Sequence, residues 1–228
     1  MIYSTNFFRQ FPIFRDLTDD ELKEIAEIAN KKEYARGSTI FIEGGKRTAV
    51  YFILSGLVKV YKVSSEGQEQ VISFLHSDEM FPHVGFFDDT DYPATATTIT
   101  DVQLMSIPIE EFDQLLLRNP KISIKVMKVM GKKLLELQQR IQAITSQDVF
   151  TRIVGALVRF SWELGKTQTD GKTIKINMPM TNTDLANLIG VTRESVNRAL
   201  NRLRKEGVIE HNRKEILILD IDRLSGYE

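Results

Sequence analysis

Residues 183–207 read TDLANLIGVTRESVNRALNRLRKEG and predict two short helices joined by a tight turn. The first helix is amphipathic, Gly190 supplies the turn, and Thr192 is a candidate N-cap for the second helix. Small residues stand where the two helices must cross closely, which is typical of a helix-turn-helix motif. A two-helix packing unit without a binding role is the alternative interpretation.

The second helix, from Arg193 to Glu206, turns Val196 and Leu203 inward and leaves polar residues near its start on the outer face. In a helix-turn-helix this face reaches base edges in the major groove of DNA. Arginine can donate a pair of hydrogen bonds to guanine, and glutamate can accept one from the cytosine amino group. The expected base-contacting residues are Arg193, Glu194, Asn197 and Arg198.

A β-hairpin is predicted beyond this helix, from residues 208–210 and 215–219, which makes the motif a winged helix-turn-helix. The tip of the hairpin carries two adjacent basic residues, a placement suited to sequence-independent contact with phosphate. Ordinary solvated surface charge is the alternative. The expected phosphate-contacting residues are Thr181, Thr192, Arg202, Arg213 and Lys214.

The distribution of charge along the chain also points to nucleic acid. The whole chain has a formal net charge of −1, whereas residues 149–228 hold 13 Lys and Arg against 10 Asp and Glu. Within residues 190–214 there are seven basic residues and three acidic ones. A concentrated basic patch attracts phosphate, although a solvated helix face would have the same composition.

Composition removes much redox and metal chemistry. None of the 228 residues is cysteine, which excludes disulfides, cysteine-ligated iron–sulfur clusters, thiolate zinc sites and cysteine nucleophiles. The histidines His76, His83 and His211 are dispersed, so we expect no metal site and no cofactor. The amino terminus lacks the basic-then-apolar order of a signal peptide, and no apolar run reaches about 18 residues. We therefore expect a cytoplasmic protein without membrane contact.

An antiparallel β-roll or sandwich is predicted for the first part of the chain. Residues 17–32 begin with a capping box, from Thr18 to Glu21, and continue as a short amphipathic helix. From Glu33 to about Ile107, short β-rich runs alternate with glycine turns at roughly 8–12-residue spacing, as in an antiparallel sandwich or roll.

A single long helix is predicted between Pro120 and Asp148, where Gly131 is the only glycine. Apolar residues follow one another there at steps of three and four, the a/d spacing that drives coiled-coil pairing. Packing on the chain's own β-domain would also produce such a stripe, but apolar residues on other faces indicate more than one partner. The expected dimer interface comprises Met127, Met130, Leu134, Leu137, Ile141 and Ile144.

Asp148 is a candidate N-cap and hinge, after which a helical period runs from Phe150 to Gly165. We therefore expect an α+β chain in three parts. These are an antiparallel β-roll sensor domain over residues 1–119, a dimerisation helix over 120–147, and a winged helix-turn-helix DNA-binding domain over 148–228.

The whole arrangement resembles the Crp–Fnr family of bacterial transcription regulators over almost the full chain. Residues 192–198, TRESVNR, resemble the start of the family's recognition helix. Gly37, Ile40, Gly56 and residues 58–60 resemble the glycine and strand pattern of its cyclic-nucleotide-binding β-roll. The long helix and the winged helix also follow in the family's order.

The resemblance implies a homodimeric transcription regulator that reads a palindromic, TGTGA-like operator through residues 193–206. It implies base contacts by Arg193, Glu194 and Arg198. The partners would be double-stranded DNA, a second copy of the chain and RNA polymerase. An unidentified small-molecule effector is left open.

The resemblance fails where members that bind cyclic AMP hold the nucleotide. Those members present Gly-Glu for the ribose and Arg-Ser-Ala for the cyclic phosphate. The matching stretches here are Pro82-His83-Val84-Gly85 and Tyr92-Pro93-Ala94. A cyclic phosphate needs a cationic partner, and the Tyr-Pro pair offers neither a charge nor an N–H at the proline. We therefore expect no control by cyclic AMP.

The substituted segment is aromatic, so it can be interpreted as the lining of a pocket for an apolar or aromatic effector. Side chains that simply fill the roll are the alternative. The candidate effector-pocket residues are Phe81, His83, Phe86, Phe87 and Tyr92.

Two other functions compete with transcription regulation. A cupin-like enzyme would need catalytic histidines, but His76 and His83 have no carboxylate–histidine arrangement nearby, so we expect no enzyme activity. A ligand-binding or protein-interaction module with a vestigial DNA-binding domain is the main alternative. The intact set of candidate base readers argues against it.

Overall fold

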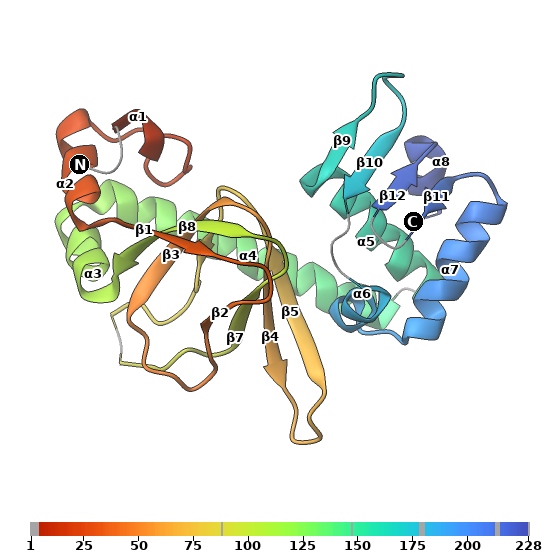
Figure 1. The fold of residues 1–228 in the computed structure, drawn as a ribbon, viewed down its shortest axis with the longest axis horizontal. Helices are drawn as coiled ribbons and strands as arrows, with labels where there is room; N and C mark the ends of the chain where they lie inside the picture. The colour runs from red at the N-terminus through yellow and green to blue at the C-terminus, as the bar shows by residue number, and fades with distance from the viewer. Residues whose placement is uncertain (1–4, 88, 147, 178–180, 213–214, 228) are drawn as a thin grey trace. The chain divides into compact units, whose positions relative to one another are not determined.

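The computed structural model describes residues 5–87, 89–146, 148–177, 181–212 and 215–227. The chain forms two compact units, residues 1–136 and 137–228, and the helix α4 (Pro120–Ser146) crosses the boundary between them (Figure 1). Both units combine helices with antiparallel sheets, which confirms the α+β class. Among the described residues, no helix is both long enough and apolar enough to cross a membrane.

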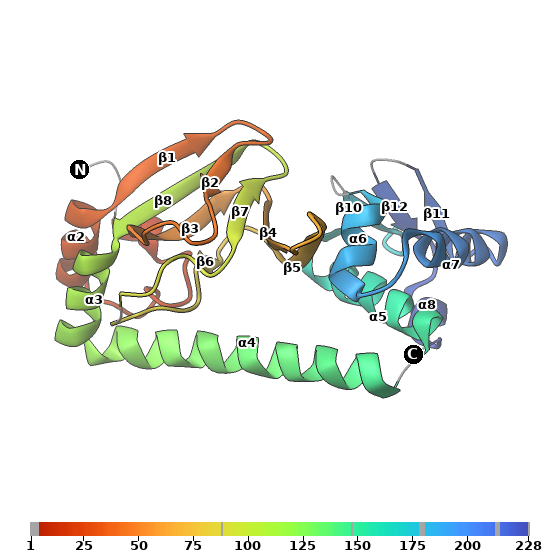
Figure 2. The same cartoon turned by 90° about the horizontal axis from the view of Figure 1, so that it is seen from below.

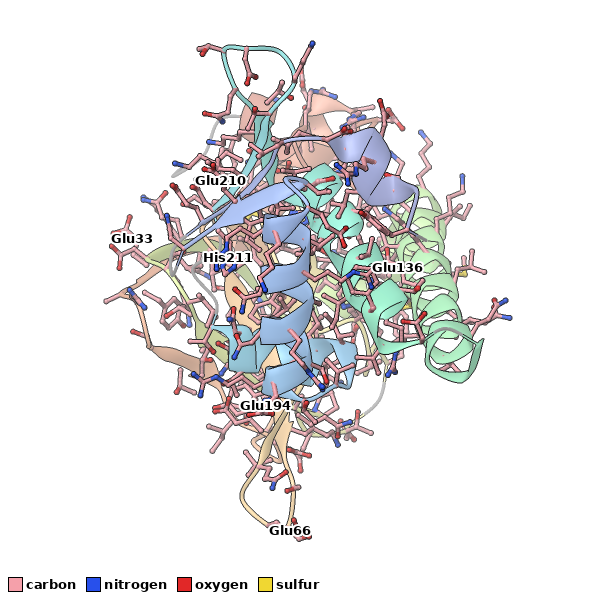
Figure 3. All side chains as sticks on the ribbon, turned by 90° about the vertical axis from the view of Figure 1, so that its right-hand side faces the viewer. Glu33, Glu66, Glu136, Glu194, Glu210 and His211 are labelled. Atoms are coloured by element: carbon pink, nitrogen blue, oxygen red, sulfur yellow. The ribbon has the colours of Figure 1, made fainter. Side chains whose placement is uncertain are left out.

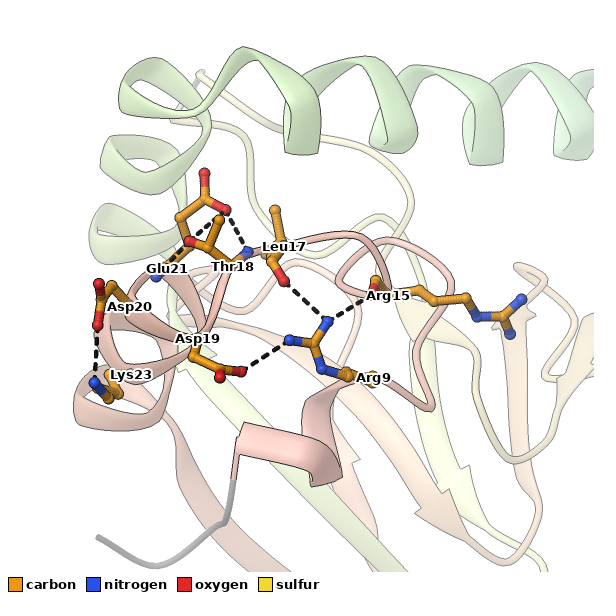
Figure 4. Close-up of polar contacts among 8 residues, drawn as sticks. All are labelled: Arg9, Arg15, Leu17, Thr18, Asp19, Asp20, Glu21 and Lys23. Atoms are coloured by element: carbon orange, nitrogen blue, oxygen red, sulfur yellow. Dashed lines mark hydrogen bonds and ion pairs between the residues drawn. The ribbon is translucent and has the colours of Figure 1, made fainter.

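Two short helices, α1 (Thr5–Phe8) and α2 (Asp19–Ile28), precede the sheets. The predicted capping box begins α2: the Glu21 amide donates to Thr18 Oγ1 at 3.3 Å, and the Thr18 amide donates to Glu21 Oε2 at 2.7 Å (Figure 4). Arg9 fastens the preceding loop by donating to two of its backbone carbonyls, at 2.9 and 3.0 Å.

The predicted antiparallel roll consists of two four-stranded sheets with strand orders β1-β8-β3-β6 and β2-β7-β4-β5. Every neighbouring pair in them is antiparallel. The strands are β1 (Asn30–Tyr34), β2 (Thr39–Phe41), β3 (Ala49–Ser55), β4 (Val58–Val63), β5 (Glu69–Leu75), β6 (Met80–Phe81), β7 (Thr95–Thr98) and β8 (Val102–Pro108).

The unit 1–136 is built on two apolar clusters. The roll core lies inside the roll, and its aromatic members are Phe41, Tyr51, Phe81 and Tyr92. The outer core joins the aromatic residues of the amino-terminal segment to α3 (Ile109–Arg118) and to the first turns of α4. The outer core therefore anchors α4 to the roll.

The long helix α4 has 27 residues and occupies the segment where the sequence predicts a single long helix (Figure 2). Ile122 and Val126 are buried in the outer core, and Met130 packs partly against it. Met130, which was predicted to lie in a dimer interface, thus packs partly against the chain's own core, and its place in an interface stays a prediction. The Ile144 side chain lies outside the described part of the chain. The exposed members of the predicted interface are Met127, Leu134, Leu137 and Ile141.

The unit 137–228 has the predicted winged helix-turn-helix architecture. Its sheet has the order β11-β12-β10-β9, so the predicted hairpin pairs with a strand that precedes the motif in the chain. Asp148 caps α5 as predicted, because its Oδ1 accepts from the Phe150 amide at 2.7 Å. The elements are α5 (Val149–Glu163), β9 (Gly165–Thr167), β10 (Ile174–Asn177), α6 (Asn182–Ile189), α7 (Arg193–Lys205), β11 (Ile209–His211), β12 (Glu215–Ile218) and α8 (Ile221–Ser225).

Candidate functional site

Helix α6 begins and ends with defined caps. The Asp184 amide donates to Thr181 Oγ1 at 3.1 Å, and the Thr181 amide donates back to Asp184 Oδ2 at 2.9 Å. After the last turn, Gly190 adopts a φ of +75°, and its amide donates to the Ala186 carbonyl at 2.9 Å. A side chain would strain this left-handed conformation, so glycine allows the tight turn into α7.

Helix α7 begins at a second cap, where the Ser195 amide donates to Thr192 Oγ1 at 3.2 Å. Thr181 and Thr192 thus both use their hydroxyl groups as helix caps, and their contact with phosphate stays a prediction. The buried face of α7 is made by Val196, Ala199, Leu200 and Leu203.

The predicted base readers stand in the first two turns of α7. Arg193, Glu194 and Arg198 are exposed, and Figure 3 shows Glu194 at the start of the helix. Asn197 is half-buried, and its Oδ1 accepts from Asn182 Nδ2 at 2.7 Å. This hydrogen bond joins Asn197 to α6. The Nδ2 hydrogens of Asn197 remain as the donors that could bond to a base.

Two residues missed by the sequence analysis extend this surface. At about 3.6 residues per turn, Glu194, Arg198, Asn201 and Lys205 fall within a strip roughly 60° wide. A shallow groove beside the strip includes Asn201 and Lys205 in its lining. Asn201 and Lys205 follow Arg198 by three and seven residues, so the helical period of the sequence would have placed both on the same side of the helix. We define the α7 outer face as Arg193, Glu194, Asn197, Arg198, Asn201 and Lys205.

Arg202, expected to contact phosphate, has partners inside its own unit. Its guanidinium carbon lies 4.0 Å from the centre of the Phe150 ring, and its Nε is 2.9 Å from Glu206 Oε1. Glu206 also accepts from the Tyr227 hydroxyl. Hydrogen bonds from Tyr227 and then Arg202 lower the pKa of Glu206, so the carboxylate is charged at neutral pH. Arg202 therefore joins α7 to α5 and to the carboxyl-terminal segment.

The wing follows α7 as β11 and β12. The Asn212 amide donates to the Glu215 carbonyl at 3.0 Å, which closes the hairpin next to its tip. Burial, and then the charge of Arg204, lower the pKa of His211, so its imidazole is neutral at neutral pH. His211 is the last residue of β11 and is labelled in Figure 3. Arg213 and Lys214, the predicted tip residues, lie outside the described part of the chain.

The candidate effector-pocket residues lie in different surroundings. Phe81 and Tyr92 belong to the roll core, where the Tyr92 and Phe41 rings stack with centroids 3.9 Å apart. Phe86 packs instead against the outer core, and Phe87 is 58% exposed. The alternative interpretation, side chains that fill the roll, therefore describes Phe81 and Tyr92, because stacked rings occupy the space that a pocket would need.

A buried arginine beside the same segment was missed by the sequence analysis. The Arg47 side chain is only 6% exposed, and its Nη1 donates to Thr90 Oγ1 at 3.1 Å. Gly85 leaves the space for it, since a Cβ there would lie 1.4 Å from Arg47 Nη1. A single arginine in a polar loop carries no sequence signal of burial.

An ionic network links the turn before β6 to α4 and was also missed. Lys133 Nζ lies 2.8 Å from Glu79 Oε1 and 3.2 Å from Glu136 Oε2. Burial alone would lower the pKa of Lys133, but the two carboxylates outweigh it and raise that pKa. His83 lies near this network, and burial, with a smaller effect of Lys133, lowers its pKa to about 4. His83 is therefore a neutral imidazole at neutral pH.

Comparison with known families identifies both units. The profile described as "Cyclic nucleotide-binding domain" matches residues 31–119, and the profile described as "Crp-like helix-turn-helix domain" matches residues 151–227. The two profiles follow one another in the order of the observed roll and winged helix-turn-helix.

Relatives align with this chain over nearly its full length. The CRP-like cAMP-activated global transcriptional regulator of Mycobacterium tuberculosis is 27% identical over 213 residues, which cover 93% of this chain and 94% of the relative. The anaerobic regulatory protein of Bacillus subtilis is 29% identical over 216 residues, covering 94% and 90%. The structure of FixK2 from Bradyrhizobium japonicum shares the fold, with a TM-score of 0.78 at 19% identity over 88% of this chain and 98% of that one. With both domains in tandem, the chain belongs to the Crp–Fnr family and is a Crp-like transcription regulator with a helix-turn-helix DNA-binding domain.

Proposed function

We propose that this protein acts as a homodimer that reads a palindromic operator through the α7 outer face and is not controlled by cyclic AMP. The α7 outer face carries the proposal. Within the described part of the chain, Arg193 and Glu194 make no side-chain hydrogen bond or ion pair, and Arg198 makes one to Ser195 Oγ at 3.3 Å. These side chains can bond to bases while the capped helix keeps its position.

Contacts with phosphate would place α7 on the duplex without reading its sequence. Lys205, at the far end of the strip, is suited to this role, as are the residues predicted at the wing tip. Arg202 is the least suited of the predicted phosphate contacts, because Phe150 and Glu206 already hold its guanidinium. Once bound to its operator, the regulator would act on RNA polymerase by recruiting it or excluding it.

The homodimer is supported by the apolar surface of α4. Isolated monomers rarely expose contiguous apolar patches of more than a few hundred Å². A two-fold dimer would present two copies of α7 to an inverted repeat of TGTGA-like half-sites. The apolar side chains of α4 that are 48–68% exposed are Ile124, Met127, Leu134, Leu135, Leu137 and Ile141.

Independence from cyclic AMP is supported by what fills the roll. Tyr92 stands where family members that bind cyclic AMP place the phosphate-binding arginine, and here it is buried against Phe41. The buried cation nearest this segment, Arg47, is packed on Gly85 and bonded to Thr90. The M. tuberculosis relative is named for activation by cAMP, and we infer that this chain differs from it in that respect.

Selection from a pool of random DNA duplexes with the full-length protein tests the proposal. We expect enrichment of an inverted repeat, and we expect the Arg198→Ala variant to lose preference at one position of each half-site. Arg118→Ala, which removes an exposed arginine of α3, is the matched control and should select the unchanged motif. A pool without an enriched motif would reject sequence reading by α7, and an identical motif from Arg198→Ala would remove Arg198 from the base readers.

A further inference from the structure

Gly131 lies near the middle of α4, where the helix itself gives no reason for a glycine. Glycine is among the poorest helix formers, because it loses more backbone freedom on folding than any other residue. Gly131 is helical and is not one of the glycines with a positive φ. Neither a cap nor an unusual backbone conformation therefore explains the residue.

The fold of the chain does not explain it either. A Cβ added at Gly131 would meet no described atom within 4 Å. By contrast, a Cβ at Gly165 would lie 2.1 Å from the Ser161 carbonyl oxygen, so that glycine is required by close packing. The surroundings of Gly131 leave room for a side chain.

Gly131 lies within the exposed apolar stripe of α4. Ile124 and Met127 precede it on the same side of the helix and are 49% and 60% exposed, and Leu134 follows at 68%. The positions on this side are Ile124, Met127, Gly131, Leu134, Gln138 and Ile141, with steps of three, four, three, four and three. This is a heptad seam of the coiled-coil type, turned away from the outer core against which Met130 packs.

We infer that α4 of a second copy crosses this helix at Gly131, with the two glycines facing each other. The inference rests on the proposed homodimer and adds the point at which the two helices come closest. The distance between packed helices depends on the side chains at their contact, so a glycine pair permits the closest approach there. We infer a parallel pair, because that alignment keeps both DNA-binding units at the same end for one operator.

The extent of the stripe supports a second copy as its occupant. A standard interface buries about 800 Å² on each partner, and six apolar side chains that are about half exposed or more supply most of such an area. Four of the six, Ile124, Met127, Leu134 and Ile141, lie on the seam, and Leu135 and Leu137 flank it on either side. The same face of a second copy is therefore self-complementary to it.

Disulfide trapping tests the crossing point directly, because the native chain has no cysteine. Gly131→Cys in the full-length protein is expected to form a cross-linked dimer under mild oxidation, since a disulfide requires Cα atoms about 4.4–6.8 Å apart. Lys132→Cys is the matched control: the residue is exposed and lies one position along, about 100° around the helix. It is expected to cross-link much more slowly.

Substitution of the same two residues by leucine provides a second test. Gly131→Leu is expected to weaken self-association at least about tenfold in analytical ultracentrifugation, because the added side chain would enter a packed contact. Lys132→Leu should leave the association unchanged. Helicity by circular dichroism should be equal or higher in Gly131→Leu, since leucine favours helix more than glycine does, so a weaker dimer would not reflect unfolding.

The outcomes separate this inference from the proposed homodimer. A dimer that tolerates Gly131→Leu and gives no preferred cross-link at residue 131 would overturn the crossing point and leave the homodimer standing. A wild-type protein that stays monomeric over the whole concentration range would overturn both. Selective cross-linking at residue 131, together with weakening by Gly131→Leu alone, would establish the crossing point.

Discussion

The guanidinium carbon of Arg202 lies 4.0 Å from the centre of the Phe150 ring, so α7 rests on the first turn of α5. Glu206 binds the same guanidinium and accepts from the Tyr227 hydroxyl, and the Tyr227 ring meets Phe150 edge-on at 5.6 Å. Phe150 follows closely after Asp148, the cap that begins α5. Residues at the start of α5 and at the carboxyl end of the chain thus help to hold α7 in place.

This contact predicts different effects of two basic residues on DNA binding. Arg202→Ala should lower the free energy of unfolding by about 1 kcal/mol, because a cation–π contact and an exposed ion pair are lost. It should leave the dependence of DNA affinity on salt unchanged. Lys205→Ala should reduce the slope of log K against log salt by about one and leave stability unchanged. Titrations by fluorescence anisotropy at several salt concentrations, with urea denaturation, measure both effects. A reduced slope in Arg202→Ala would restore Arg202 as a phosphate contact.

The sequence predicts most elements of the fold because the local signals agree with the tertiary packing. Glycine turns bound the strands β2 to β5, and caps such as Asp148 mark helix starts. The strand β1 has the polar sequence NKKEY and is almost entirely exposed, so no apolar alternation identifies it. Its strand conformation comes from pairing with β8, more than 60 residues away, as in the pair Asn30 and Ser106.

The candidate sites were predicted less completely, because burial of charge and helix rotation depend on the rest of the fold. Steps of three and four along α4 can pass through either Met130 or Gly131. The sequence pattern favours the series through Met130, because Gly131 breaks the run of apolar residues in the other series. Packing of Met130 on the outer core settles which face is covered by the chain itself. The ionic contact between Lys133 and Glu79 joins residues 54 positions apart, so no local pattern contains it.

The exposed stripe of α4 predicts that charge will separate the dimer without unfolding the chain. In the double variant Leu134→Lys and Leu137→Lys, two side chains that are 68% and 48% exposed in one copy become cationic. Like charges would oppose one another in the dimer, so we expect monomers in analytical ultracentrifugation and a severe loss of operator binding. Leu117→Lys on α3, where the leucine is 65% exposed, is the control and should remain dimeric. An unchanged dimer in the double variant would contradict an interface on this face.

The filled roll predicts that cyclic AMP will not bind and that Tyr92 is needed for stability. Calorimetric titration of the full-length protein with cyclic AMP should give no specific heat at sub-millimolar concentrations. Tyr92→Ala should destabilise the protein by about 3 kcal/mol, because the removal of a buried aromatic ring leaves a cavity beside Phe41. Phe87→Ala, at a position 58% exposed, should change stability by no more than about 0.5 kcal/mol. Micromolar binding of cyclic AMP, or a Tyr92→Ala protein as stable as the wild type, would contradict the filled roll.

His83 predicts a dependence of stability on pH. Burial, assisted by Lys133 and opposed by Glu79 and Glu136, lowers the pKa of His83 from 6.5 to about 4. At pH values between about 4 and 6.5, the unfolded chain binds a proton at His83 and the folded chain does not. The stability contributed by the neutral imidazole is therefore complete above pH 6.5 and is lost as the pH falls toward 4. Urea denaturation from pH 7 to 4.5 should show a shallower decline for His83→Gln, with slopes that differ by at most about 1.4 kcal/mol per pH unit. Parallel curves for the two proteins would place His83 in solvent.

The α7 outer face predicts which substitutions alter base choice and which alter affinity alone. Arg193 and Arg198 lie about 140° apart around the helix, so together with Glu194 they can span several base pairs of one half-site. Arg198→Ala should cost roughly 1–3 kcal/mol on the preferred operator and relax the choice at one guanine, because the bidentate contact is lost. Lys214→Ala should weaken all sequences about equally and flatten the salt dependence.

Affinities on a panel of operators with single-base changes distinguish these roles. For the wild type, each change in the half-site should cost about 1–3 kcal/mol. For Arg198→Ala, the cost should vanish at one position and persist at the others, since Arg193 and Glu194 occupy separate places on the helix. Arg118→Ala again serves as the control, because this exposed arginine of α3 lies outside the DNA-binding unit and should leave every position unchanged. If Arg198→Ala weakened every operator alike and kept the wild-type preference at each position, Arg198 would be a phosphate contact, and sequence reading would fall to Arg193 and Glu194.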